Sequence, residues 1–328
     1  MAADRSDTSC SAGTHIPVLL DRVCDLLAPC LQRQPGALLI DATVGMGGHC
    51  AALLSRCGQA RAIGVDRDPD ALLIAGQRLA GFAPRVRLVR GSLGELDEAV
   101  RAAGQDPQDR PAAAVVIDLG VSSWQLDTPS RGFSYARDAP LDMRMDPSTV
   151  LTAAQIINGY EVDRLRALLW QFGEERWAGR IAAGIVRQRQ RQPITRTGEL
   201  VALIREAIPA AARRTGGHPA KRTFQALRIE VNDELGQLRR GLQQALALLQ
   251  PQGRCAVLAY HSSEDRIVKH AFAALTRRTA PLDLPVTHDS DPAPARLVTR
   301  GGERPDPAEV AANPRARSAH LRCLEMVT

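Results

Sequence analysis

Residues 38–49 (LLIDATVGMGGH) limit the fold of this chain more than any other stretch. They predict a buried strand that ends in Asp41, a turn with three glycines and the start of a helix. Glycine suits such a turn because the backbone visits positive φ and because a side chain would block the close approach of a ligand. A strand, a turn and a helix in this order form the nucleotide sites of open α/β sheets. We therefore expect Gly45, Gly47 and Gly48 to border a nucleoside cofactor.

Acidic side chains at the strand ends indicate which cofactor fits. Asp41 ends the first strand, and Asp66 ends the next apolar run at 62–65. A carboxylate at the first turn would repel a pyrophosphate, whereas it would attract the ammonium and sulfonium groups of S-adenosylmethionine. Asp66 is placed to accept hydrogen bonds from ribose hydroxyls, which both cofactor types carry. Asp41 therefore favours S-adenosylmethionine over NAD.

Two further segments, 86–89 and 112–118, predict the third and fourth parallel strands. The fourth strand again ends in a carboxylate, that of Asp118. Because the carboxyl ends of parallel strands meet at one edge of a sheet, Asp41, Asp66 and Asp118 should line a single crevice. Three such residues are harder to explain as helix caps than one would be.

The segment that follows the fourth strand has no regular period, and we predict a long functional loop. It holds Trp124, Phe133 and Tyr135, three of only eleven aromatic residues in the chain, and Arg131 lies between them. This composition suits the stacking of a base that has left its helix. Alternatively, the aromatic side chains fill the core of a helical insertion.

Helical periodicity then runs from residue 152 to about residue 209. Within it we expect Trp170 and Trp177, seven positions apart, on one buried helix face. Residues 221–249 predict one long helix, and a fifth strand follows at 255–260. The sheet is thus interrupted after its fourth strand by roughly a hundred mostly helical residues.

Positive charge is concentrated in this insertion. Residues 176–228 hold twelve basic side chains, including Arg222 and Arg228, against only Glu199 and Glu206, whereas the whole chain has a net charge of +6. A positive region on a mildly acidic body predicts a polyanionic substrate that docks at one place. The alternative is that these residues form ordinary solvated helix faces.

The C-terminal part of the chain offers a second group of polar candidates. His261 and Ser262 follow the fifth strand directly, at the same predicted edge as Asp118. Residues 281–314 are rich in Pro, Asp and Gly and predict an extended surface loop, and 319–327 predict the closing strand.

Composition argues against several classes of protein. The seven cysteines are never spaced as a Cys-x-x-Cys pair, so we expect small apolar residues in a reducing compartment. Residues 1–14 are small and polar and predict a disordered tail without a signal peptide. No apolar run approaches membrane-spanning length. We expect a cytoplasmic protein with no membrane segment and no bound metal.

As a set, the motifs resemble one family, the bacterial 16S rRNA cytosine-N4 methyltransferases, which modify a cytidine of the decoding region. Two departures are Trp124, where a proline is common, and Ser263, where a leucine is common. The resemblance runs in one order through most of the chain and is carried by 15–20 (HIPVLL), 41–49 (DATVGMGGH), 118–123 (DLGVSS), 131–134 (RGFS), 141–145 (LDMRM), 173–176 (GEER), 223–229 (TFQALRI), 261–266 (HSSEDR) and 313–318 (NPRARS).

The resemblance implies a class I S-adenosylmethionine-dependent methyltransferase (Rossmann-like) α/β sheet with an inserted, mostly helical domain. By position, the core would be 15–124 and 221–328, and the substrate-binding insertion would be 125–220. The implied cofactor is S-adenosylmethionine and the implied partner is the 16S rRNA of the small ribosomal subunit, while the oligomeric state stays open, with a homodimer as one option. Together with the residues argued above, the expected cofactor contacts are Asp41, Gly45, Gly47, Gly48, His49, Asp66, Leu93, Asp118 and Gln125, and the expected substrate contacts are Trp124, Arg131, Phe133, Tyr135, Arg222 and Arg228.

Methyl transfer to the exocyclic amine of cytosine depends mainly on positioning. The amine is a poor nucleophile because its lone pair is delocalised into the ring, so an acceptor that holds an N–H and later takes the proton would help. Asp118 is the first candidate for this acceptor, and His261 and Ser262 are the second. The Asn/Asp-Pro-Pro-Tyr motif of many amino-methyltransferases is absent after the fourth strand.

Two other functions stay open at this point. A nicotinamide-dependent oxidoreductase is disfavoured by Asp41 and by the absence of a Tyr-x-x-x-Lys proton relay. A non-catalytic RNA-binding factor for ribosome assembly could use the same fold, and its role should survive loss of the cofactor site. The sequence also leaves open whether free rRNA or the assembled subunit is the substrate.

Overall fold

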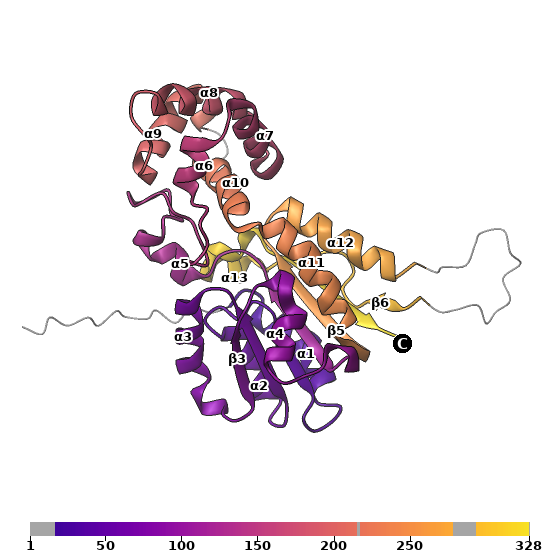
Figure 1. The fold of residues 1–328 in the computed structure, drawn as a ribbon. Coiled ribbons are helices and arrows are strands. Elements are labelled where there is room, and N and C mark those ends of the chain that lie inside the picture. The colour runs from indigo at the N-terminus through magenta and orange to yellow at the C-terminus, as the bar shows by residue number, and fades with distance from the viewer. Residues whose placement is uncertain (1–16, 215–216, 278–292, 328) are drawn as a thin grey trace, which may run out of the picture.

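A computed structural model describes residues 17–214, 217–277 and 293–327. The predictions for residues 1–14, for His15 and for residues 281–292 lie outside the described residues. Seven strands form one sheet in the order β3-β2-β1-β4-β5-β7-β6 (Figure 1). The strands are β1 Leu38–Asp41, β2 Arg61–Asp66, β3 Val86–Arg90, β4 Ala112–Asp118, β5 Leu249–Ala259, β6 Ala295–Leu297 and β7 His320–Met326.

The strand order confirms the predicted α/β sheet. β1 to β5 pair in parallel, whereas β7 is antiparallel to both β5 and β6. The chain adds β2 and β3 on one side of β1 and then crosses to place β4 on the other side. Such a crossing opens a crevice at the carboxyl ends of β1 and β4, where open α/β sheets bind their ligands.

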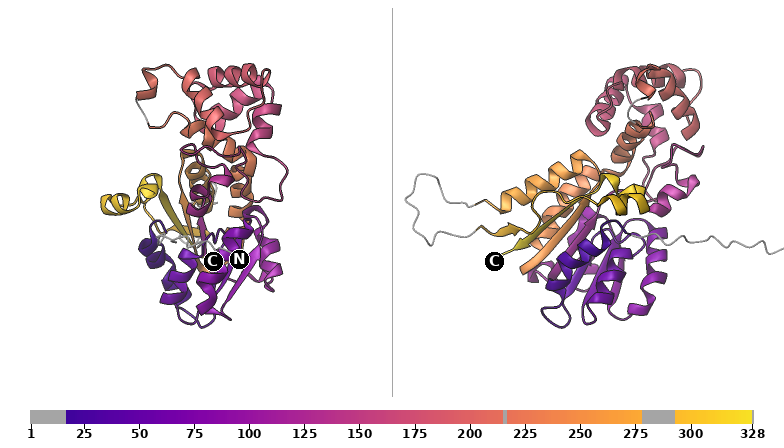
Figure 2. Two further views of the ribbon diagram at one scale, coloured as in Figure 1. Left: turned by 90° about the vertical axis from the view of Figure 1, so that its left-hand side faces the viewer. Right: turned by 180° about the vertical axis from the view of Figure 1, so that it is seen from behind.

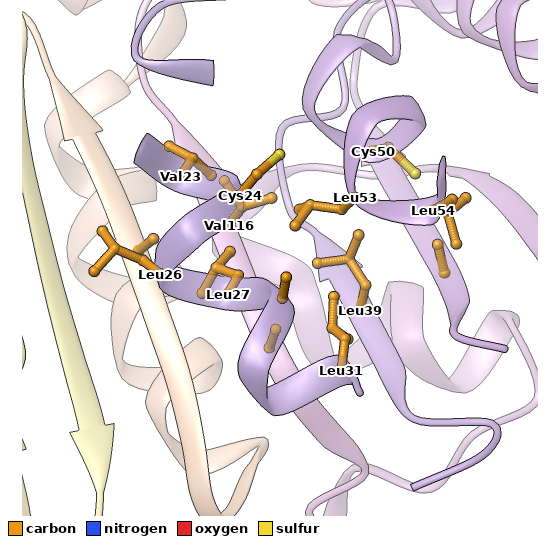
Figure 3. Packing of buried hydrophobic residues seen from close by; sticks show 14 of the residues in the cluster. Val23, Cys24, Leu26, Leu27, Leu31, Leu39, Cys50, Leu53, Leu54 and Val116 are labelled. Carbon is orange, nitrogen blue, oxygen red and sulfur yellow. The ribbon is translucent and has the colours of Figure 1, made fainter. Parts of the chain in front are cut away.

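Helices cover both faces of the sheet. They are α1 Leu20–Leu31, α2 Gly48–Arg56, α3 Pro69–Leu79, α4 Leu96–Ala102, α11 Glu234–Ala247 and α12 Ser262–Leu275. Leu39 of β1 joins the apolar cluster of α1, α2 and α3, while Ile40 joins the cluster of α4, α11 and α12 on the opposite face. Successive side chains of a strand face opposite sides, so a strand that is apolar throughout must be covered twice. Figure 3 shows the first cluster, where Leu27 of α1 and Leu53 of α2 pack near Leu39.

A third apolar cluster, from Phe133 to Val231, forms a helical domain beyond one end of the sheet (Figures 1 and 2). Its helices are α6 Ala153–Gly159, α7 Val162–Gly173, α8 Ala178–Arg189, α9 Thr197–Ala207 and α10 Lys221–Asn232. α10 packs against α7 and then leads into α11, so it joins the helical domain to the sheet. The short helix α5 Ser123–Asp127 follows β4, and α13 Pro307–Ala312 follows β6.

The prediction of one helix over 221–249 is wrong. Asp233 has a φ of 48°, in the left-handed region, and separates α10 from α11. The buried side chain of Asn232 accepts a hydrogen bond from the N–H of Met145 and donates one to the carbonyl of Met143. α10 therefore stays with the helical domain and α11 with the sheet, a break that tertiary contacts impose and helical periodicity does not report.

The predicted core position of Trp170 is also wrong, because this side chain is 64% exposed. α7 ends before Glu174, which has a φ of 49°, and Trp177 is the N-cap residue of α8. The spacing of seven therefore does not keep the two rings on one helix face. Trp177 is half-buried, and the guanidinium carbons of Arg176 and Arg180 lie 5.8 and 5.2 Å from its ring centroid.

The prediction of an extended loop over 281–314 holds only in part. Its described portion contains β6 and α13, and the side chain of Asp306 caps α13 by accepting the N–H of Glu309. Cys24, Cys30, Cys50, Cys57, Cys255 and Cys323 are buried and not joined in disulfides, as expected for small apolar residues. Among the helices of the described ranges, none is both long and apolar enough to cross a membrane.

Candidate active site

A cavity of about 610 Å³ lies between the carboxyl ends of the parallel strands and the helical domain. Its walls come from the glycine turn after β1, from residues that follow β2 to β5, and from one face of α10. The predicted site residues that line it are Gly45, Gly48, His49, Asp66, Leu93, Asp118, Gln125, Phe133, Tyr135, Arg228 and His261. Those that lie outside its lining are Asp41, Gly47, Trp124, Arg131, Arg222 and Ser262.

The turn after β1 needs its glycines for two reasons. Gly45 and Gly47 have φ of 50° and 79°, in the left-handed region that favours glycine. Gly48 opens α2, and a Cβ atom there would collide with the ring of Pro17. At Gly45 and Gly48 the turn therefore lines the cavity with backbone atoms alone.

Asp66 is held in place by two backbone donors. Its Oδ2 accepts the N–H of Gly45 at 2.8 Å, and its Oδ1 accepts the N–H of Asp68 at 2.9 Å. Burial raises the pKa of the Asp66 carboxyl to about 6, and these donors work in the opposite direction. Each carboxylate oxygen has a further lone pair, so Asp66 can also accept hydrogen bonds from a ligand in the cavity.

Asp41 does not line the cavity, although the sequence suggested that it would. Its side chain is buried, and its Oδ1 lies 3.4 Å from the N–H of Thr43. Burial raises the pKa of the Asp41 carboxyl to about 8, and the nearby carboxylates of Asp118 and Asp66 raise it further. Asp41 is therefore largely protonated near pH 7, so it shapes the turn but does not supply the negative charge that the sequence argument assigned to it.

Asp118 is the carboxylate at the centre of the site. Its Oδ1 accepts a hydrogen bond of 2.7 Å from the hydroxyl of Tyr260, and its Oδ2 lies 3.6 Å from Nδ1 of His49. The Nε2 of His49 lies 3.1 Å from the carbonyl oxygen of Val18, which can only accept a hydrogen bond. The Asp118 backbone N–H donates to Oγ1 of Thr43 at 2.7 Å, so residues from β1, β4 and β5 fix its position together.

Tyr260 was not predicted to be part of the site. It lines the cavity directly after β5, and burial together with the Asp118 carboxylate raises its pKa well above the usual value of 10. The phenol therefore stays protonated, and its hydroxyl donates a hydrogen bond to Asp118. The sequence could have indicated Tyr260 as a site residue, because it follows β5 directly and precedes His261, and β5 pairs with β4, which ends in Asp118.

Gln125 lines the cavity, but both ends of its amide have partners within the protein. Its Nε2 donates to Oδ2 of Asp68 at 2.7 Å, and its Oε1 accepts the N–H of Ser122 at 3.0 Å. Arg131 forms an ion pair of 2.8 Å with the same buried Asp68 carboxylate, and its guanidinium carbon lies 5.2 Å from the ring centroid of Trp124. In this arrangement Arg131 and Trp124 fix the loop against the end of β2.

The other two aromatic residues of the loop reach the cavity. The ring of Tyr135 stacks on His218 at 4.4 Å and meets Phe224 of α10 edge-on at 5.8 Å. Phe133 is buried in the apolar cluster of the helical domain and also lines the cavity. These rings therefore belong to the helical core, as the alternative interpretation of the loop predicted, and they also form one wall of the cavity.

A partly buried polar cluster of Arg228, Glu234, His261 and Glu264 forms the wall between α10 and α12. Arg228 pairs with both oxygens of Glu234 at 2.8 and 2.9 Å, and Nε2 of His261 lies 3.1 Å from Oε1 of Glu264. Ligand atoms of the two glutamates and the histidine lie within 4.8 Å of one another, which is close enough for a metal ion. The Arg228 guanidinium and the N-terminus of α12 already place positive charge there, so the cluster needs no cation for balance.

Ser262 and Arg222 meet at Glu174, the residue after α7. The hydroxyl of Ser262 donates to Oε1 of Glu174 at 2.6 Å, and Nη1 of Arg222 donates to its carbonyl at 3.0 Å. These contacts connect the helical domain to the N-terminus of α12 beside His261. Neither side chain lines the cavity itself.

One face of α10 lines the cavity, and apart from Arg228 its residues there were assigned no role from the sequence. Lys221, Phe224, Gln225 and Arg228 follow one another at helical spacing and all line the cavity. Residues three and four apart lie on one side of a helix, so this face could have been found once α10 was known to cover the site. Arg317 and Ser318 line the cavity from the C-terminal segment.

Comparisons with known proteins match this chain along nearly its whole length. A family model described as the MraW methylase family matches residues 12–327. A protein of Acidothermus cellulolyticus named ribosomal RNA small subunit methyltransferase H is 54% identical over 327 residues, which cover 100% of this chain and 98% of that protein. A protein of the same name from Mycolicibacterium gilvum is 56% identical over 313 residues, which cover 95% of this chain and 83% of that protein. The similarity therefore spans both the sheet and the helical domain.

Among solved structures, an rRNA methylase from Streptococcus thermophilus aligns with 96% of this chain and 99% of that chain. The two are 13% identical, and the TM-score is 0.43.

Proposed function

The chain belongs to the MraW methylase family, and from that premise we propose that it transfers the methyl group of S-adenosylmethionine to the exocyclic N4 of a cytidine in 16S rRNA. The observation that carries this proposal is the joint placement of Asp66, Asp118 and the glycine turn around one cavity at the carboxyl ends of the strands. A ribosomal substrate implies that the protein acts in the cytoplasm.

The residues present fit S-adenosylmethionine. Asp66 offers acceptor lone pairs for ribose hydroxyls, and Leu93 offers an apolar surface for the adenine. The carboxylates of Asp66 and Asp118 both line the cavity, so they favour a ligand with cationic groups over a pyrophosphate. When bound, S-adenosylmethionine supplies an activated methyl group on its sulfonium.

Asp118 is the residue that we assign to the amine. In the reaction N4 gains a carbon and must lose one proton, while the carbon–sulfur bond breaks. A carboxylate that accepts a hydrogen bond from N4–H favours rotation of the amine about the C4–N4 bond, which localises its lone pair on N4. The same carboxylate can take the proton after the methyl group has been transferred. Tyr260 holds Oδ1 of Asp118 at 2.7 Å, which orients the carboxylate during these steps.

The helical domain is proposed to bind the RNA that carries the target base. α10 forms one wall of the cavity, and residues 176–228 hold twelve basic side chains against two acidic ones. A base must leave its helix to reach a cavity of this kind, and Phe133, Tyr135 and Phe224 provide aromatic and apolar walls for it. The insertion would then be the substrate-binding domain, with α10 extending it past the predicted boundary at 220.

Mapping of modified nucleosides in small-subunit RNA by mass spectrometry tests the proposal. The RNA would come from cells that lack this chain and from the same cells with the wild type, Asp66→Ala or Glu98→Ala, the last an exposed residue of α4 outside the cavity lining. We expect one N4-methylcytidine to disappear in the deletion, to return with the wild type and Glu98→Ala, and to stay absent with Asp66→Ala. An unchanged methylation profile in the deletion would support a non-catalytic assembly factor instead.

A further inference from the structure

Trp170 is a large aromatic side chain that the helical core does not use. It lies on α7 with 64% of its surface exposed, whereas Trp124 and Trp177, the other two tryptophans of the chain, are partly buried against arginines. A single exposed apolar residue is common on protein surfaces and needs no function. The surroundings of Trp170 therefore decide whether it is more than that.

Arginines surround this part of the helical domain. Arg166 lies one helical turn before Trp170 on α7, and its Cδ would lie 3.7 Å from a Cβ atom placed on Gly179 of α8. Arg180 is the next residue of α8 and lies over the ring of Trp177. The acidic group nearest to Arg166 on its own helix is Asp163, which is paired with it at 3.3 Å. The junction of α7 and α8 therefore carries Trp170 and the exposed Arg180, with Glu174 as an exposed acidic residue between them.

This surface is continuous with the edge of the active site. Trp170 lies one turn before Glu174, whose N–H donates to the carbonyl of Trp170 at 3.0 Å. Four helical residues span about 6 Å along the axis. Glu174 in turn accepts the hydroxyl hydrogen bond of Ser262, which follows the cavity residue His261. An RNA strand that leaves the cavity past His261 and Glu174 would therefore run toward the end of α7 that carries Trp170.

We propose that Trp170 is a stacking platform for an unpaired RNA base that flanks the nucleotide in the cavity. The inference rests on the proposed function, because it takes the substrate to be RNA. Nucleic acid is the occupant that the charge of the adjoining segment favours, since residues 176–228, which follow α7, hold twelve basic side chains against two acidic ones and so complement phosphates. An indole ring stacks on any base, so the platform would hold the strand without reading its sequence.

Binding of a fluorescently labelled single-stranded oligoribonucleotide from the target region tests this proposal. We expect Trp170→Ala to weaken binding about tenfold, the loss typical of one base–aromatic contact, and Trp170→Phe to retain most of the affinity. Leu73→Ala is the matched control, because Leu73 is 65% exposed on α3 in the sheet domain and should not affect binding. Binding should also quench the tryptophan fluorescence of the wild type, and Trp170→Phe should lose most of that quenching.

Three results would overturn the proposal. The first is that Trp170→Ala binds RNA as the wild type does. The second is that this variant loses affinity for the assembled subunit but not for RNA, a result that would indicate a protein partner. A change of sedimentation in Trp170→Ala would indicate self-association instead. Asp66→Ala separates this proposal from the methylation proposal, since it should still bind RNA with full quenching when no methyl group is transferred.

Discussion

The hydroxyl of Tyr260 donates a hydrogen bond of 2.7 Å to Oδ1 of Asp118 and so joins the ends of β5 and β4. The raised pKa of Tyr260 keeps this proton on the phenol. Asp118 is thereby held in one orientation before any ligand arrives. Preorganised groups of this kind lower a reaction barrier because they need not be reoriented during the reaction.

Replacement of Tyr260 by phenylalanine should therefore reduce the rate of methyl transfer. The ring would still fill its place, but Asp118 would lose a hydrogen bond to a charged group, worth about 1.5–3 kcal/mol. We expect kcat to fall by about tenfold or more, with little change in the dissociation constant of the cofactor. Single-turnover kinetics and calorimetry measure the two quantities.

Tyr160→Phe is the matched control for this experiment. The hydroxyl of Tyr160 donates to Oε1 of Glu230 at 2.8 Å, outside the cavity lining, so the same kind of hydrogen bond is removed elsewhere. Its kcat should equal that of the wild type. If both variants lost activity equally, Tyr260 would have only a structural role.

The affinity for S-adenosylmethionine should depend on pH through Asp66. Its pKa of about 6 is raised by burial, so the carboxyl becomes neutral as the pH falls below that value. The neutral form is the poorer acceptor for ribose hydroxyls, and the dissociation constant should rise by up to about tenfold per pH unit. Calorimetric titrations from pH 5 to pH 8 measure this dependence with buffers of about equal ionic strength. Asp66→Asn should bind more weakly and with a flat pH profile, whereas an unchanged slope in this variant would assign the titration to another group.

Asp41 should make the cofactor-free protein less stable as the pH rises. Its folded-state pKa of about 8 lies above the usual value of 3.8 for an aspartate, so the native state keeps a proton that the unfolded chain has lost. The stabilisation is complete below the unfolded pKa and is lost as the pH rises through the folded pKa. The slope from this group reaches about 1.4 kcal/mol per pH unit. Urea unfolding of the wild type and of Asp41→Asn between pH 4 and pH 8 should show a smaller decline in the variant, and equal declines would contradict the assignment.

The sequence predicted the parts of the site that depend on local signals. β4 ends at Asp118 and β2 at Asp66, as the apolar runs indicated, and Gly45 and Gly47 take the positive φ values that the turn requires. A strand end or a glycine turn is specified by a few adjacent residues. The carboxyl ends of parallel strands then gather these residues without further information.

The remaining parts depend on contacts between distant segments. The left-handed residues Glu174 and Asp233 end α7 and α10, and these breaks place Trp177 outside the helix of Trp170 and separate α10 from α11. Neither residue is a glycine, so no local pattern marked the breaks. The burial of Asp41 likewise depends on how the turn packs, which periodicity does not report.

The buried ion pair between Arg131 and Asp68 leads to a further prediction about stability. The Asp68 side chain is fully buried, and Arg131 meets it at 2.8 Å while also donating to the carbonyls of Arg144 and Met145. Arg131→Met would leave a buried carboxylate without its cationic partner, and such a loss costs about 3–5 kcal/mol. Urea unfolding should show this decrease in the free energy of unfolding.

Two further variants separate charge from packing in that experiment. In the Arg131→Met/Asp68→Asn double variant the uncompensated charge is gone, while the Asn side chain can still accept a hydrogen bond from Gln125. The double variant should therefore be more stable than Arg131→Met alone, since removing both charges is less costly than leaving one unpaired. Arg240→Met breaks a half-exposed pair with Asp233 at 2.8 Å and should change stability little, because solvent screens that pair. If the double variant were no more stable than Arg131→Met, the loss would come from the carbonyl contacts of Arg131 and not from the buried charge of Asp68.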